Sequence, residues 1–186
     1  MKTATVKLTS ASPLTQSRKH DSPKLPKELP DAYEHRTWKN KAHIGKNGRV
    51  TLPAFGLKMA LVDAAKYSGD QIPGKGKSTW TKKFMSGVLL LDNPETNRTA
   101  DDLIPVGINA NSDGVRGSGK RVHRIMPTLD EWQATAMFHI VDDIITEDVF
   151  LRYLTMAGQF IGIGQYRVQN GGMNGRFSAE IINWQE

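Results

Sequence analysis

Residues 157–177 contain six glycines, and this density limits how the chain can fold more than any other stretch. Glycine adopts positive φ angles and lets a second backbone or a ligand approach closely, which is typical of a loop whose amides face a large partner. Arginines beside such glycines would bind phosphate, and aromatic rings would stack on bases. The structural alternative is a helix C-cap followed by a glycine-rich hairpin. The candidate contacts are Gly162, Gly164, Tyr166, Arg167, Gly171, Gly172, Gly175 and Arg176.

Charge favours a polyanionic partner. The 186 residues include 25 Lys/Arg and 19 Asp/Glu, for a formal charge of +6, and residues 1–49 alone hold eleven Lys/Arg against four acids. The absence of cysteine excludes disulfides, thiolate nucleophiles and thiolate metal sites. The N-terminus lacks the apolar run of a signal peptide, and no segment has the apolar length of a membrane span. We therefore expect a cytoplasmic protein with no membrane contact.

Hydrophobic periodicity predicts an α+β protein. Two amphipathic helices are expected at 53–68 and 146–157, with a helical turn at 100–104. Short strands are expected at 3–8, 49–52, 87–91, 106–109, 134–141 and 177–184. The order is roughly βαββαβ, which favours a ferredoxin-like or RRM-like antiparallel sheet with helices on one face. The hydrophobic content of 38% fits one domain over residues 1–186, with long basic loops inserted at about 10–48, 69–86 and 110–124.

These three loops supply further candidate nucleic-acid contacts. In residues 33–43 basic side chains alternate with aromatic ones, which fits a nucleic-acid surface or, equally, a short helix that Tyr33 and Trp38 anchor to the core. The segment Gly74–Thr79 lacks the glycine spacing of a phosphate-binding P-loop, so we interpret it as a lysine-rich loop. We expect all three loops and the glycine-rich stretch to converge on one side of the sheet. The candidate residues are Arg18, Lys19, Arg36, Trp38, Lys39, Lys41, Lys75, Lys77, Lys82, Lys83, Arg116, Lys120, Arg121 and Arg124.

The sequence gives fewer indications of catalysis than of nucleic-acid binding. His35 and His43 lie in the first basic loop and are the best acid–base candidates, although the spacing places no second acid–base partner beside them. His139 is interpreted as a solvated sheet residue. No pair of histidines has metal-ligand spacing, so neither a metal nor a cofactor is expected.

Several motifs resemble known families. Leu52-Pro53-Ala54 before the first helix, the βαββαβ order and the glycine-rich loop after the second helix resemble the CRISPR-associated RAMP superfamily, particularly its backbone subunits. Across nearly the whole chain, a second set of motifs resembles a bacteriophage protein family: Ser12–Ser17, Arg36-Thr37-Trp38, Ile72–Lys77, Phe160–Arg167 and Gly175-Arg176-Phe177.

The RAMP resemblance implies an RRM-like domain that lies along single-stranded DNA or RNA and multimerises side by side. The bacteriophage resemblance implies that the protein acts in a bacterial host cell. The five glycines Gly162, Gly164, Gly171, Gly172 and Gly175 match the glycine-rich loop, and residues 36–41 would lie in an inserted element. At 186 residues the chain lacks the large accessory domains of many backbone subunits, which argues against a helical filament.

Three functions are compatible with the sequence. The leading hypothesis is a non-enzymatic single-stranded nucleic-acid-binding protein that forms homo-oligomers. The second is a metal-independent ribonuclease of RAMP type, since some RAMP relatives use a histidine as general acid or base. The third is a phage factor that binds a host or phage protein and interferes with a host complex.

Overall fold

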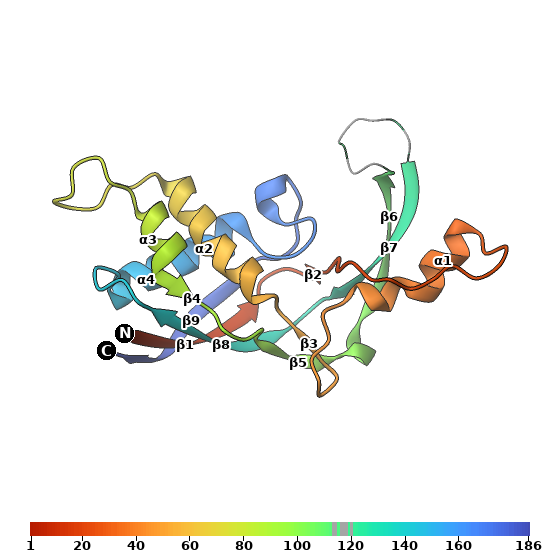
Figure 1. Ribbon diagram of the computed structural model, residues 1–186, viewed down its shortest axis with the longest axis horizontal. Coiled ribbons are helices and arrows are strands. Elements are labelled where there is room, and N and C mark those ends of the chain that lie inside the picture. Colours follow the sequence, from red (N-terminus) through yellow and green to blue (C-terminus); the bar gives the residue numbers. More distant parts are fainter. Residues whose placement is uncertain (113–114, 116–118, 120) are drawn as a thin grey trace.

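The computed structural model describes residues 1–112, 115, 119 and 121–186, and this part forms two antiparallel sheets and four α-helices (Figure 1). The expected α+β class is confirmed. A six-stranded sheet has the order β3-β5-β8-β1-β9, with β4 also paired to β8, and a three-stranded sheet has the order β2-β7-β6. The strands are β1 (Lys2–Ser10), β2 (Leu14–Thr15), β3 (Arg49–Thr51), β4 (Val88–Leu89), β5 (Glu95–Thr99), β6 (Ile104–Asn111), β7 (Arg121–Leu129), β8 (Gln133–Ile140) and β9 (Phe177–Gln185).

Alternation of apolar and polar residues fixes which face of the large sheet is buried. Val6 of β1 pairs with Ala136 of β8 and with Ile181 of β9, and Val6 and Ala136 are fully buried. The residues directly before and after Val6 and Ala136 on their strands point to the other face of the sheet, because successive side chains of a strand alternate. One face of the sheet is therefore core, and the other is open.

Three helices cover the apolar face: α2 (Ala54–Ser68), α3 (Trp80–Gly87) and α4 (Glu147–Met156) (Figure 1). α2 follows Pro53 and ends at Gly69, whose φ of 65° is left-handed. Thr146 is the N-cap of α4, and its hydroxyl accepts a hydrogen bond from the Val149 amide. The rings of Phe84 and Tyr153 meet edge to face at 4.8 Å between the helices.

The small sheet continues three neighbouring strands of the large sheet after a bend. The adjacent strands β5, β8 and β1 of the large sheet are connected along the chain to β6, β7 and β2, which keep the same order in the small sheet. The β6–β7 hairpin thereby projects away from the helix-covered part (Figure 1). Helix α1 (Pro30–Thr37) and the 3₁₀ turn η1 (Trp38–Lys41) pack against β7.

The basic segments are less irregular than their sequence predicts. The first holds α1 and η1, the alternative that the sequence left open, and the second contains α3, which the lysines and glycines before Trp80 obscured. Strands β5 and β7 were not expected either, because the polar run Glu95–Thr99 shows no apolar alternation and β7 contains Pro127, a residue that sheets disfavour. The strand expected at 87–91 is only the two-residue β4.

Two apolar residues of α2 do not face the core. Phe55 and Tyr67 share the helical spacing of the apolar residues in 53–68, but they are 74% and 64% exposed. No helix within the described ranges is long and apolar enough to cross a membrane.

Candidate nucleic-acid interface

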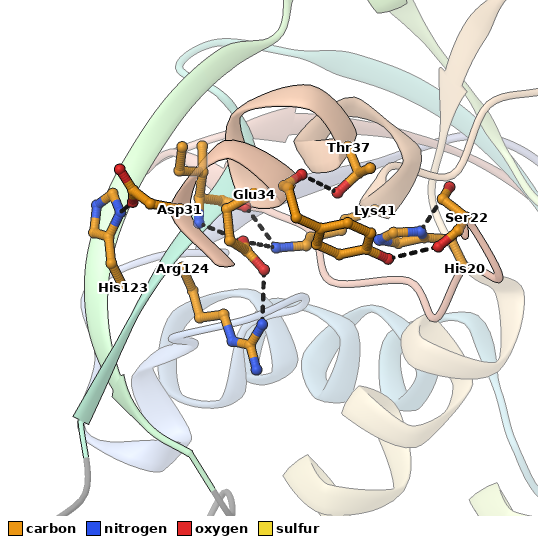
Figure 2. A network of polar contacts seen from close by, with 10 residues as sticks. His20, Ser22, Asp31, Glu34, Thr37, Lys41, His123 and Arg124 are labelled. Carbon is orange, nitrogen blue, oxygen red and sulfur yellow. Dashed lines mark hydrogen bonds and ion pairs between the residues drawn. The ribbon is translucent and has the colours of Figure 1, made fainter. Parts of the chain in front are cut away.

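A buried carboxylate on α1 determines how this helix sits against β7. Glu34 is 2% exposed and accepts hydrogen bonds from Arg124 Nη1 at 2.7 Å and from the Ile125 amide at 3.0 Å (Figure 2). Lys41 Nζ donates to the same carboxylate and, at 3.0 Å, to the Ile125 carbonyl. Burial raises the pKa of Glu34, but the hydrogen bonds from Lys41, the Ile125 amide and Arg124 outweigh it and hold the pKa below its ordinary value. Glu34 is therefore ionised and fully partnered.

A second polar contact joins the same two elements. His123 Nδ1 of β7 lies 2.9 Å from Asp31 Oδ1 of α1 (Figure 2), and His35 Nε2 lies 3.8 Å from Asp31 Oδ2. The two imidazole centroids are 6.3 Å apart. One carboxylate thus lies between two exposed imidazoles at the start of α1.

The segment before α1 folds back onto the ring of Tyr33. The Tyr33 hydroxyl donates to the Ser22 carbonyl at 2.8 Å, and the His20 ring stacks on Tyr33 with centroids 6.1 Å apart. Arg36 binds Glu28 through two hydrogen bonds of 2.7 and 2.8 Å and also lies over the Tyr33 ring. The hydrogen bond from Arg36 is the main reason that the pKa of Glu28 falls to about 2. His20 and Tyr33 therefore form an ordered aromatic pair.

A cavity of about 440 Å³ opens between residues 17–20, α1 and β7. Four cationic side chains face it, and Glu34 is the one carboxylate among its lining residues, which leaves an excess of positive charge. Arg18 and Lys19 are exposed, whereas Lys41 is 7% exposed. The His20 and Tyr33 rings complete its wall. The cavity therefore combines two exposed cations, Arg18 and Lys19, with a stacked ring pair.

Two residues expected to contact nucleic acid are engaged by polar groups of the protein itself. Lys41 is buried in its ion pair with Glu34, so its ammonium cannot reach a ligand. Arg36 is bound to Glu28 and to the Pro23 carbonyl. The sequence shows which residues are cationic but not which carboxylates pair with them. The pair Lys41–Glu34 lies between η1 and α1, and the pair Arg36–Glu28 joins α1 to the segment before it.

The other candidates of the first loop remain accessible. Lys39 lies 5.6 Å from the ring centroid of Trp38 and 3.9 Å from Asp101 Oδ1. Trp38 is half-buried against the core. Arg121 is exposed on β7, and Arg116 and Lys120 lie outside the described residues.

The two candidate histidines have different surroundings. His35 lies beside Asp31 and His123, as described above, whereas His43 follows η1 and its amide donates to Gln16 Oε1 at 2.8 Å. Burial, and then the charge of Arg18, lower the pKa of His43. No contact within the described residues joins His35 to His43, so they do not form an acid–base pair.

Glycines in the glycine-rich stretch allow close packing of neighbouring backbone segments. The amides of Gly162, Gly171 and Gly172 donate to carbonyls within the stretch, and the Gly175 amide donates to the Pro13 carbonyl at 2.8 Å. A Cβ at Gly172 would lie 1.8 Å from the Tyr166 carbonyl oxygen. The expected display of these four amides to a phosphate chain is therefore wrong. Gly164 lies against Thr15, where a Cβ would be 2.5 Å from the carbonyl oxygen.

Tyr166 and the arginines lie on the surface of this stretch. Tyr166 has a positive φ of 56°, and burial raises the pKa of its half-buried hydroxyl. Arg167 Nε binds Gln169 Oε1 at 3.2 Å, and Arg176 Nε binds the Gln159 carbonyl at 3.1 Å. Each guanidinium keeps further donors for a ligand.

The lysine-rich loop and α1 lie at opposite ends of the longest axis (Figure 1). Lys75, Lys77 and Lys82 are exposed, and Lys83 pairs with Asp142 at 3.0 Å. The expected convergence of all basic segments on one side is therefore not observed. The glycine-rich stretch adjoins β2 through the Thr15–Gln165 bridge, and β2 pairs with β7. Among the described parts of these segments, the first loop, the glycine-rich stretch and the hairpin are neighbours.

Sequence reasoning missed an exposed aromatic pair on the helical side. Tyr67 of α2 stacks on Phe160 with centroids 5.6 Å apart, and the rings are inclined by 17°. Phe160 belongs to a π-helical turn, η3 (Ala157–Ile161), and is 48% exposed. The sequence shows both aromatics, but their pairing depends on the wider π turn. Glu34, Asp31 and His123 were also missed, since no local pattern links α1 to β7.

Within the part of the chain that the structure describes, no group of three or more histidines and acids is placed to hold a metal ion. The chain matches no protein-family model, and no curated protein matches it.

Proposed function

We propose that the protein binds single-stranded nucleic acid in the cationic cavity between residues 17–20, α1 and β7. The observation that carries the proposal is the excess of cations around a concave space whose wall includes the stacked His20–Tyr33 pair. Phosphates would be bound by Arg18, Lys19 and Arg124, and a base would stack on the exposed side of the ring pair. Cations combined with stacking rings are the usual means of binding unpaired strands.

Neighbouring segments extend this surface. The Tyr166–Arg167 side of the glycine-rich stretch adjoins β2, which pairs with β7. A strand that leaves the cavity would reach these side chains next. We include multimers along the strand and a bacterial cytoplasmic location in the proposal, as the family resemblance implies.

We also propose that the large sheet has the ferredoxin-like arrangement. Across the sheet, the antiparallel strands follow the order β4 or β5, then β8, β1 and β9, which supports this arrangement. Along the chain, α2 and α3 lie between β1 and β4, and α4 lies between β8 and β9, as the ferredoxin-like order requires. The β6–β7 hairpin and α1 are then an inserted arm, and the cavity lies on that arm.

The test compares two charge-matched double variants by fluorescence anisotropy with labelled single-stranded DNA and RNA. Arg18→Ala with Lys19→Ala removes two cations at the cavity, and Lys75→Ala with Lys77→Ala removes two at the far end. We expect the first variant to bind about tenfold or more weakly and to show a shallower dependence on salt, since each phosphate contact contributes to the salt slope. The second variant should bind nearly as the wild type does. Equal losses, or no oligonucleotide binding by the wild type, would overturn the proposal.

A second candidate function is metal-independent cleavage of RNA by His35 and His123. The observation that favours it is Asp31 between the two imidazoles, because one histidine could act as base and the other as acid. Labelled RNA incubated in EDTA with wild type and with the single variants His35→Ala and His43→Ala tests it. Cleavage lost in the first variant and kept in the second supports the hypothesis, and an intact substrate with wild type rejects it.

A further inference from the structure

The open face of the large sheet carries a concavity of about 590 Å³ that the proposed function does not use. It lies over β5 and β8 and includes the turn that precedes β5. We propose that it binds a nucleobase, either that of a free nucleotide or one turned out of a bound strand. The site is separate from the cationic cavity, with which it shares no lining residue.

Alternate residues of β8 form the floor. Gln133, Thr135, Met137 and His139 point away from the helices, because the residues between them face the core. Lys7 of β1 pairs with Thr135 across the strands and lies beside them. A floor of this composition offers hydrogen-bonding groups around a single flexible apolar side chain.

Several polar groups in this concavity make no hydrogen bond to the described residues. Asn93 Oδ1 accepts the Ala54 amide and Asn97 Oδ1 accepts the Gln133 amide, both at 2.8 Å, so their NH₂ groups are held in place with no partner among the described residues. In the same part of the chain, the side chains of Gln133 and Thr135 and the Lys7 ammonium make no hydrogen bond, and the buried Nδ1 of His139 has no partner either. Around Glu34, by contrast, the carboxylate accepts from Lys41, Arg124 and the Ile125 amide.

The chemistry of these groups selects the class of ligand. Amide and hydroxyl groups match the mixed donors and acceptors on the edge of a base. Met137 and Leu91 are 56% and 71% exposed at the concavity and can cover a planar ring face. Lys7 and Arg49 are offset by Asp92 and Glu95, so net charge would contribute little and recognition would fall on the base. The volume lies within the range of small-ligand pockets.

The test follows the Met137 methyl group by NMR while nucleoside monophosphates of the four bases are added to the full chain. We expect saturable shifts at Met137 with at least one of them, and about tenfold weaker binding by Gln133→Leu with Thr135→Val. Ser178→Ala is the matched control, since Ser178 is exposed on neighbouring β9 but does not line the concavity. It should bind as wild type does.

Two comparisons within this experiment identify the source of the base. Shifts produced only by an intact oligonucleotide, and not by its abasic counterpart, indicate a base of the bound strand. Shifts with free nucleotides that persist in the Arg18→Ala/Lys19→Ala variant indicate a separate nucleotide site, even if strand binding at the cationic cavity fails. Absence of any saturable change at Met137, or unchanged affinity of a folded Gln133/Thr135 variant, would overturn the inference.

Discussion

Arg124 Nη1 of β7 lies 2.7 Å from Glu34 Oε1 of α1, and this contact joins elements 90 residues apart in sequence. The same carboxylate binds Lys41 and the Ile125 amide. Glu34 therefore holds α1 against the hairpin and also shapes the floor of the cationic cavity. Stability and the proposed binding surface depend on one buried charge.

Replacing Glu34 with alanine should destabilise the fold by about 3 to 5 kcal/mol, because it leaves the buried Lys41 ammonium without its counterion. Urea unfolding followed by circular dichroism measures the difference. The matched control is the double variant Glu34→Leu with Lys41→Met, which removes both charges and keeps apolar volume. Its loss of stability should be smaller than that of Glu34→Ala, because no unpaired charge remains buried and the loss comes from the Ile125 amide and carbonyl. A loss below about 1 kcal/mol in the single variant would contradict this role for Glu34.

Acid should weaken the fold through the same residue. The pKa of Glu34 is lower in the folded state than its ordinary value of 4.5, so its stabilising contribution is complete above 4.5. As the pH falls below 4.5 the unfolded chain takes up the proton first, and the contribution disappears as the pH passes the folded pKa. The difference in unfolding free energy between wild type and Glu34→Gln should therefore be constant near neutral pH and shrink below 4.5. A constant difference down to pH 3 would contradict this.

The helix-covered sheet could be predicted from sequence because its signals are local. β1 and β8 alternate apolar and polar residues, and α2 has an apolar face bounded by Pro53 and Gly69. Such patterns depend on neighbours within a few residues, so they require no knowledge of the fold. Polar strands such as β5 carry no comparable pattern and were missed.

The candidate site was predictable only in part, because its geometry depends on distant pairs. The charge of residues 1–49 indicated a cationic region, and Arg18 and Lys19 are exposed beside the cavity. The sequence could not show that Glu34 would bury Lys41 and engage Arg124 of β7. The spacing of the glycines likewise did not distinguish amides turned outward from amides bonded to neighbouring backbone.

Arg18 should contribute to the lowered pKa of His43. Burial and then the charge of Arg18 lower the pKa of His43 below its ordinary value of 6.5. Arg18→Ala removes the second cause and should raise the pKa towards 6.5 without restoring it fully. NMR titration of the histidine ring protons measures both values, with Lys46→Ala as a control that removes an exposed cation elsewhere in the same segment. An unchanged pKa in Arg18→Ala would show that the two groups do not interact.

Two glycines with the same backbone conformation should respond differently to alanine. Gly175 and Gly171 have φ angles of 79° and 78°, so a side chain strains both. At Gly175 a Cβ would also lie 1.9 Å from the Ile163 carbonyl oxygen, whereas at Gly171 no atom lies within 4 Å. Gly171→Ala should therefore cost about 1 to 2 kcal/mol. Gly175→Ala should cost more than about 3 kcal/mol, since it also separates the paired backbones of Ile163 and Gly175. Urea unfolding of both variants measures the difference, and equal losses would mean that close packing is not what requires glycine at 175.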